Sequence, residues 1–109
     1  MLVCRDLSIE LSPEDRAKIG PEVQAWVTEM EGRDVRLRGD VLAPVDLTTT
    51  VSVREDQLLV ERGPRVDTAA PASGYNLIEC RDLDEAIEVS AKHPIARLGL
   101  IELRPIAEA

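Results

Sequence analysis

His93 is the only histidine of the chain, and it is the one side chain expected to titrate near neutral pH. It is therefore the natural candidate for a general acid or base. Asp40, which follows Gly39 in a predicted strand, is the candidate that would orient His93 or hold a ligand. Both residues have a plainer alternative. A histidine just before Pro94 can bond the last carbonyls of a helix, and glycine followed by aspartate is common in turns.

Four charged residues are further candidates for ligand binding. Glu102 and Arg104 lie two positions apart in the last predicted strand, so they share a face. They are either a charged pair in a pocket or an ion pair at its rim. Arg62 and Arg65 flank Gly63-Pro64 in an irregular loop. Two guanidinium groups suit capture of an anion such as a carboxylate, and the alternative is a solvated turn.

The two cysteines, Cys4 and Cys80, stand in no Cys-x-x-Cys or Cys/His cluster, so no zinc site is predicted. We interpret them as buried, reduced thiols that fill the core. The chain also lacks a phosphate-binding loop, a dinucleotide fingerprint and any metal-ligand spacing. Neither a metal nor another cofactor is therefore expected.

The composition indicates one domain of 109 residues with 21 acidic and 13 basic side chains, a formal charge of −8. This charge repels phosphate backbones and anionic lipid surfaces, which argues against nucleic acid as a partner. Leu2-Val3-Cys4 is followed at once by Arg5 and Asp6, so no signal peptide or membrane segment is predicted. We expect a cytoplasmic protein.

Two helices are predicted from their start signals. Ser12-Pro13 opens the first, with a kink or restart at Pro21. Its buried face is expected to comprise Val23, Trp26, Val27 and Met30. Asp82 caps the second, with Glu85 in capping-box position, and Pro94 ends it near His93. Its buried stripe is expected to comprise Leu83, Ala86, Ile87 and Ala91.

Six segments have strand character, at residues 2–4, 35–41, 48–54, 58–61, 75–80 and 98–104. The third and fourth form a β-hairpin. The resulting order is a split βαβ arrangement, an α+β, ferredoxin-like fold with an added hairpin. We expect the strands of Cys4 and Cys80 to be parallel neighbours at the centre of the sheet. Two helices on one face leave the other face bare, and a second copy of the chain could cover it, forming a barrel.

With these elements in order, the chain resembles the YCII-related family, in the branch named for a DGPF motif, within the dimeric α/β barrel superfamily. The resemblance covers nearly the whole chain. It rests on Leu11-Ser12-Pro13-Glu14, Gly39-Asp40, Leu42, Pro44, Thr49-Thr50-Val51, Gly63-Pro64, Gly74-Tyr75, Asp82-Leu83-Asp84-Glu85-Ala86, His93-Pro94, Glu102 and Arg104-Pro105. It implies a homodimer, and it adds Tyr75 to the ligand-binding candidates.

The chain departs from that family pattern at two places. Where the branch usually reads Asp-Gly-Pro-Phe, this chain has Arg62-Gly63-Pro64-Arg65. In the smaller founding members a histidine on the first helix and an aspartate before a proline form a proposed catalytic pair. Here His93 stands at the position of the aspartate, and residues 13–31 contain no histidine.

Two functions therefore remain open. The first is a non-catalytic dimeric module that binds a small organic ligand in the barrel cavity, which the missing pair and the altered loop favour. The second is a cofactor-independent acid/base enzyme, similar to the isomerases and oxygenases of the superfamily, with His93 as the acid or base and Asp40 as its orienter.

Overall fold

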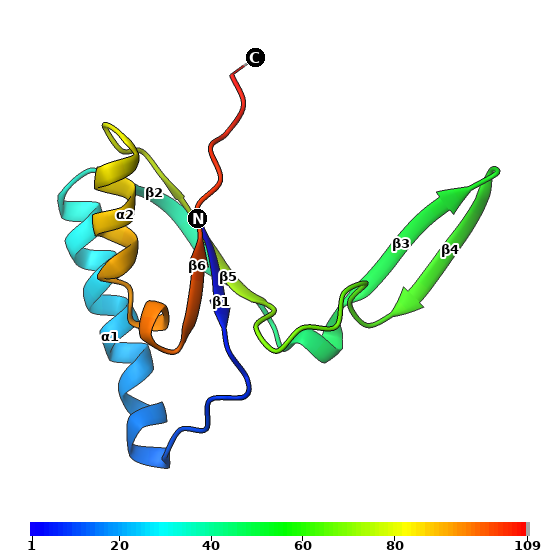
Figure 1. Cartoon of the computed structure of the whole chain (residues 1–109), viewed down its shortest axis with the longest axis horizontal. Helices are drawn as coiled ribbons and strands as arrows, with labels where there is room; N and C mark the ends of the chain where they lie inside the picture. The colour runs from blue at the N-terminus through cyan, green and yellow to red at the C-terminus, as the bar shows by residue number, and fades with distance from the viewer. Residues whose placement is uncertain (109) are drawn as a thin grey trace.

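Two helices cover one face of a four-stranded sheet, and a separate hairpin projects on the opposite side, in a computed structural model that describes residues 1–108 (Figure 1). This confirms the predicted α+β, ferredoxin-like fold with an added hairpin. The elements are β1 (Leu2–Arg5), α1 (Pro13–Gly32), β2 (Arg36–Val41), β3 (Thr49–Arg54), β4 (Gln57–Arg62), β5 (Ala72–Ile78), α2 (Leu83–Ala91) and β6 (Gly99–Glu102), with 3₁₀ turns at Val45–Leu47 and Pro94–Arg97.

The sheet has the strand order β2-β5-β1-β6, and every neighbouring pair is antiparallel. The parallel pairing predicted for β1 and β5 is therefore wrong. Helix α1 connects β1 to β2, and these two strands run in the same direction. Strand β5 lies between them in the sheet and runs in the opposite direction to both. Cys80 lies beyond the end of β5, and Cys4 pairs with Ala72 at its start. The two thiols therefore lie toward opposite ends of the sheet.

Helix α1 begins where the sequence predicts and runs without a break. Ser12 accepts a hydrogen bond from the backbone N–H of Asp15 at 3.1 Å, as a helix cap does. The predicted restart at Pro21 is wrong, because the helix continues through this residue to Gly32. Pro21 is exposed, so its ring meets solvent. It removes only one hydrogen-bond donor from a helix whose C-terminal half is anchored by the buried residues Trp26 and Met30.

Helix α2 has the predicted cap but a different buried face. Asp82 accepts from the backbone N–H of Glu85 at 2.9 Å. The predicted stripe is wrong in part, because Leu83 and Ile87 are 63% and 51% exposed and Ala91 is also exposed, whereas Val89 is fully buried. The helix has only nine residues, and its C-terminal end is the part that packs against α1.

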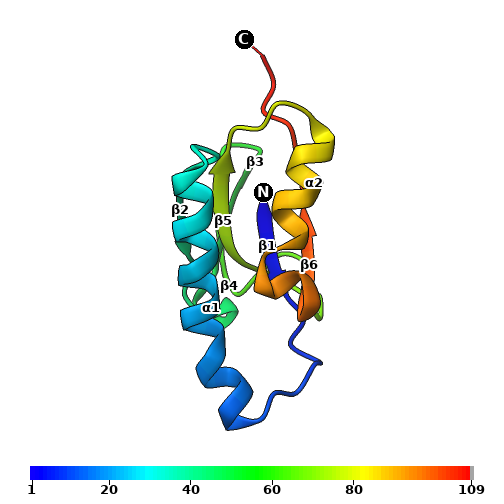
Figure 2. The same ribbon diagram turned by 90° about the vertical axis from the view of Figure 1, so that its left-hand side faces the viewer.

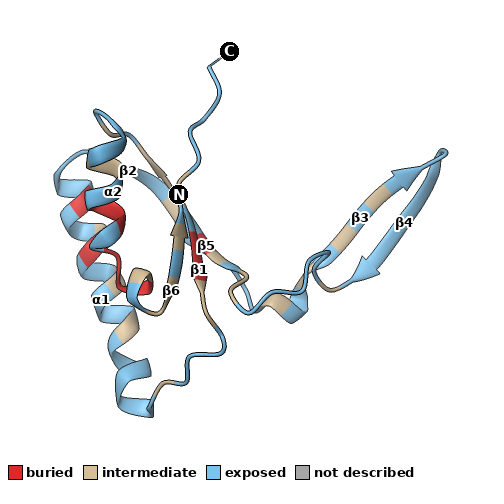
Figure 3. Ribbon diagram, in the orientation of Figure 1, coloured by how far each residue is buried: buried red, intermediate tan, exposed pale blue. Residues whose placement is uncertain are grey.

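The main core cluster lies between the helices and the sheet and consists of Trp26, Met30, Val35 and Val89. Figures 2 and 3 show α1 and α2 on the same side of the sheet, with most of the buried residues where they meet. Trp26 also joins the two helices by a hydrogen bond, since its indole N–H donates to the carbonyl of Val89 at 2.9 Å. That carbonyl belongs to the last turn of α2, where backbone acceptors lack partners within the helix.

The other face of the sheet is open. Leu2, Tyr75 and Leu100 share this face through the cross-strand register, and they are 38%, 36% and 43% exposed. Apolar side chains at the centre of a sheet are ordinarily covered by a second layer. No other part of the chain between residues 1 and 108 forms such a layer (Figure 1).

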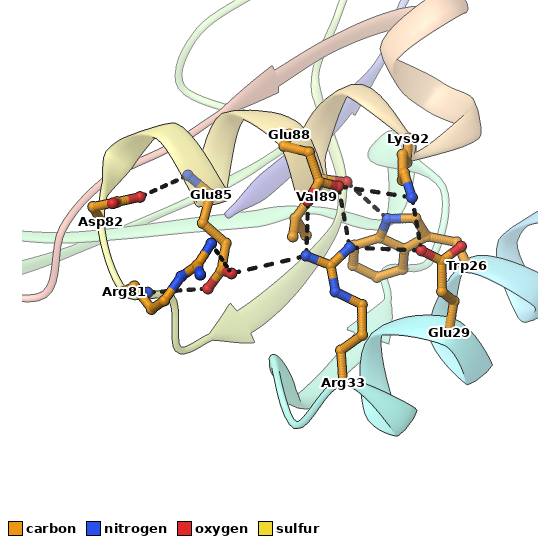
Figure 4. A network of polar contacts seen from close by, with 9 residues as sticks. All are labelled: Trp26, Glu29, Arg33, Arg81, Asp82, Glu85, Glu88, Val89 and Lys92. Atoms are coloured by element: carbon orange, nitrogen blue, oxygen red, sulfur yellow. Dashed lines mark hydrogen bonds and ion pairs between the residues drawn. The ribbon is translucent and has the colours of Figure 1, made fainter.

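An ion-pair network joins the two helices at the surface (Figure 4). The Arg33 guanidinium lies 2.7 Å from Glu88 and 3.6 Å from Glu29, and Lys92 lies 2.9 Å from Glu29. The hydrogen bond from Arg33 lowers the pKa of the Glu88 carboxyl. Because these side chains are 31–50% exposed, the network is screened by water and salt.

We expect Arg33→Met to cause only a small loss of melting temperature. The loss should shrink in about 1 M NaCl, where screening already weakens the native pairs. Thermal unfolding at low and high salt measures both effects. Arg16→Met, in the first turn of α1, which Arg33 ends as C-cap, is the control. A loss for Arg33→Met that is large and independent of salt would contradict this description of the network.

Candidate functional site

His93 is buried between the helices and the sheet, with 3% of its surface exposed. Its ring meets the indole of Trp26 edge to face, with the ring centres 4.8 Å apart. Its Nδ1 accepts a hydrogen bond from the backbone N–H of Ile95 at 3.1 Å. His93 therefore acts as a hydrogen-bond acceptor that caps the following 3₁₀ turn. Its Nδ1 does not donate to the last carbonyls of α2, which was the plainer alternative for this residue.

The protonation state of His93 follows from this environment. Burial lowers the pKa of the imidazole from 6.5 to about 4, because a charged ring would lose its hydration. The ring is therefore neutral at pH 7. Since Nδ1 acts as an acceptor, the single ring proton resides on Nε2. His93 thus offers a hydrogen-bond donor, and it is a weak base.

A cavity of about 600 Å³ lies beside His93, between α1 and the helix-covered face of the sheet. This volume falls in the range of ordinary small-molecule sites. The wall is mostly apolar, and its apolar side chains include those of Val3, Ile19, Val23, Trp26, Val27 and Ile95. The polar lining residues include Arg36, Asn76 and His93. Two carboxylates, those of Glu31 and Asp40, also reach the lining, and they are paired with Arg36 and Tyr75.

Arg36 and Asn76 are held in place by each other and by their neighbours. Arg36 Nε donates to Asn76 Oδ1 at 2.8 Å, and Arg36 Nη1 donates to Glu31 of α1 at 2.8 Å. Its Nη2 donates to the carbonyl of Gly39 at 3.1 Å. A Cβ at Gly39 would collide with the side chain of Asn76, so this glycine gives Asn76 its space. With one lone pair of its Oδ1 taken by Arg36, Asn76 still has its two amide N–H groups to donate to a ligand.

Asp40 and Tyr75 form a pair on the open face of the sheet. They are direct partners in the β2–β5 ladder, and the Tyr75 hydroxyl donates to Asp40 Oδ2 at 2.7 Å. This hydrogen bond raises the pKa of Tyr75. Both residues reach the cavity lining, but strand alternation points their side chains away from Gly39 and Asn76. The structure therefore does not join Asp40 to His93.

The remaining predicted site residues lie apart from the cavity. Glu102 ends β6 opposite Leu2, on the open face. Arg104 lies beyond β6, so the two do not share a strand as predicted. Arg62 ends β4, and Arg65 follows it in the loop after the hairpin. Both arginines are exposed, and this hairpin extends away from the helices and their cavity (Figure 1).

Sequence reasoning missed Arg36 and Asn76 as functional candidates, and it favoured a core role for Trp26 over the alternative that Trp26 faces a ligand. One signal for them was present. Asn76 places an amide between Tyr75 and Leu77 inside a strand, and Gly39 stands inside another strand, where glycine often marks a close approach. A second hollow of about 750 Å³ adjoins the cavity and shares Arg5 and Ile19 with it. It has fewer lining residues and lies at the start of α1.

The described residues provide neither a metal site nor an activated thiol. Residues 1–108 contain no group of three His, Cys, Asp or Glu side chains placed to hold a metal ion. Burial raises the pKa of the Cys4 and Cys80 thiols, which lowers their reactivity. Within the same residues, neither helix has the length and apolar character needed to cross a membrane.

Comparison with known proteins places this architecture in a family. No curated protein matches the chain. A family model described as the YCII-related domain matches residues 1–109, the full length of the sequence. The chain therefore belongs to the YCII-related family.

Proposed function

We propose that this protein binds a small, partly apolar organic molecule in the cavity between α1 and the sheet. The observation that carries the proposal is the combination of a mostly apolar wall with hydrogen-bond donors from Arg36, Asn76 and His93. Three donors favour a ligand with an acceptor group, such as a carboxylate or carbonyl. Sequence analysis expected the ligand between two paired sheets, and we assign it to the helix-covered face because the cavity lies there.

Binding without catalysis accounts for His93 better than acid/base chemistry does. An efficient general base has a pKa near the working pH, and burial holds the pKa of His93 at about 4. The predicted orienter, Asp40, is hydrogen-bonded to Tyr75 instead. The second candidate function, a cofactor-independent acid/base enzyme, is supported by the position of His93 in the cavity wall.

Benzoate is a suitable probe of the cavity, because it combines an apolar ring with a carboxylate. We expect it to change the fluorescence of Trp26, the only tryptophan, which lines the cavity. Benzyl alcohol should bind more weakly, since it carries no charge to strengthen hydrogen bonds from the donors. A titration followed by fluorescence measures both dissociation constants.

Val23→Phe is the test variant, because a larger side chain at this position fills the cavity. We expect it to weaken benzoate binding by about tenfold or more, a loss of about 1.4 kcal/mol. Ala25→Phe is the matched control, since Ala25 is exposed on the same helix. Equal responses from wild type, Val23→Phe and Ala25→Phe would place the benzoate outside the cavity.

We further propose that the protein is a homodimer in which two open sheet faces pack together. The exposed apolar residues Leu2, Tyr75 and Leu100 support this arrangement, which is isologous and closed. The face is also charged at its edges, with Asp40 on β2 and Glu102 on β6. Light scattering should give about twice the chain mass of 12.0 kDa. A mass of one chain at high micromolar concentration would contradict the dimer.

We also propose that the chain belongs to the DGPF-motif branch of the family and that its hairpin loop contacts an anion. Gly63-Pro64 and Gly74-Tyr75 support membership of the DGPF-motif branch, and the exposed pair Arg62 and Arg65 suits an anion contact at the base of the hairpin. The formal charge of −8 argues against binding to nucleic acid or anionic membranes, and we propose that the protein is cytoplasmic.

A further inference from the structure

The hairpin β3–β4 forms an arm that has no cover in its own chain. Its two strands pair over six positions, from Thr49 opposite Arg62 to Arg54 opposite Gln57, and they form a sheet of their own. The turn between them is tight, with positive φ angles at Glu55 and Asp56, as in the two-residue turns typical of hairpins. An isolated two-stranded hairpin is at best marginally stable in water.

The two faces of this arm differ in character. Val51 pairs with Val60, and Val53 pairs with Leu58. These four aliphatic side chains share one face, and they are 57–67% exposed. The opposite face carries Thr50, Ser52 and Arg54 on β3, and Leu59 is its one large apolar residue. An amphipathic ribbon of this kind requires a partner for its apolar face.

The position of the arm indicates what that partner is. The arm stands on the side of the sheet away from the helices, which is the side of the open face (Figures 1 and 2). Face-to-face sheets pack about 10 Å apart. A second copy on the open face would therefore lie alongside the arm, and by two-fold symmetry its own arm would lie alongside the first copy.

The size of the open face also calls for additional contact. The four strands hold 21 residues and lie about 4.8 Å apart, which gives a footprint of roughly 340 Å². The accessible surface of the side chains is larger than this flat footprint. Even about twice the footprint falls short of the roughly 800 Å² that each partner buries in a standard interface. The arm adds a ribbon of roughly 200 Å² in footprint, so it supplies much of the missing contact.

We infer that the hairpin β3–β4 is a dimerisation arm whose apolar face, formed by Val51, Val53, Leu58 and Val60, packs against the flank of a second copy of this chain. The inference rests on the homodimer proposed above. It adds a second contact region to the interface, and it explains why a solvent-facing ribbon retains four aliphatic side chains on one face.

A pair of variants tests the arm by analytical ultracentrifugation over a dilution series. Val51→Lys with Val60→Glu removes the apolar pair and keeps a favourable cross-strand charge pair. We expect it to raise the dimer dissociation constant by roughly tenfold or more. The control, Ser52→Lys with Leu59→Glu, places the same charges at the adjacent pair on the opposite face. It should change the constant by less than about threefold.

A second measurement does not depend on whether a variant folds. In wild-type protein, hydrogen exchange of residues 49–62 should slow as the concentration rises through the dimer dissociation constant. Leu100→Glu, on the open face, separates this inference from the proposed dimer. Suppose that Leu100→Glu breaks the dimer, that the arm variant keeps the wild-type dissociation constant, and that exchange of residues 49–62 does not depend on concentration. The arm inference is then overturned and the dimer stands. If wild type is a monomer throughout, both are overturned.

Discussion

Trp26→Ala is expected to lower the free energy of unfolding by about 3–5 kcal/mol, the usual cost of removing a large buried aromatic side chain. Trp26 is 4% exposed and contacts both His93 and the core cluster. Its loss would leave a cavity, and it would remove the hydrogen bond to the carbonyl of Val89. For a domain whose total stability is typically about 5–15 kcal/mol, this is a large fraction.

Two further variants show whether the effect of Trp26→Ala is specific. Trp26→Phe keeps a ring and loses the indole N–H, so we expect an intermediate loss. Thr28→Ala, at an exposed position of the same helix, should stay within about 0.5 kcal/mol of wild type. Urea denaturation gives all three free energies. A Trp26→Ala protein as stable as Thr28→Ala would show that the packing of α1 on α2 is not as described.

The second large effect concerns pH. The pKa of His93 is about 4 in the folded protein and 6.5 in the unfolded chain. As pH falls below 6.5 the unfolded state takes up a proton while the folded state remains neutral, so stability falls with pH until both states are protonated below about 4. Between pH 7 and pH 4 this group alone should cost roughly 3 kcal/mol.

His93→Asn isolates that contribution. Its carboxamide oxygen can still accept the backbone N–H of Ile95, as an asparagine cap does, but it does not titrate. We expect the stability difference between pH 7 and pH 4 to be roughly 3 kcal/mol smaller in this variant. Since the chain has a single histidine, its proton NMR titration is free of overlap. A measured pKa near 6.5 would contradict the buried, neutral ring.

The predictable parts of the fold are those that depend on neighbours in the sequence. Ser12 and Asp82 cap the two helices as their types and positions indicate, and the turn at Glu55-Asp56 closes the predicted hairpin. The predictions that are wrong concern features that depend on tertiary packing. The helix does not restart at Pro21, since packing of the remaining helix outweighs one lost hydrogen bond. The buried face of α2 depends on how α1 crosses it, which a nine-residue pattern does not encode.

The site was predictable only in part, for a similar reason. His93 was recognised as its central residue, but its burial against Trp26 changes a supposed acid or base into a neutral donor. Asp40 seemed its natural partner because the sequence does not reveal which face of a strand a residue occupies. Arg36 and Asn76 meet across neighbouring strands, from positions 40 residues apart.

The most direct test of the central claim is a crystal structure of the protein soaked with benzoate. Our account predicts the ring against Val23 and Trp26, with the carboxylate about 3 Å from donors of Arg36, Asn76 or His93. Benzoate bound between two paired sheets, with the cavity between α1 and the sheet empty, would contradict it.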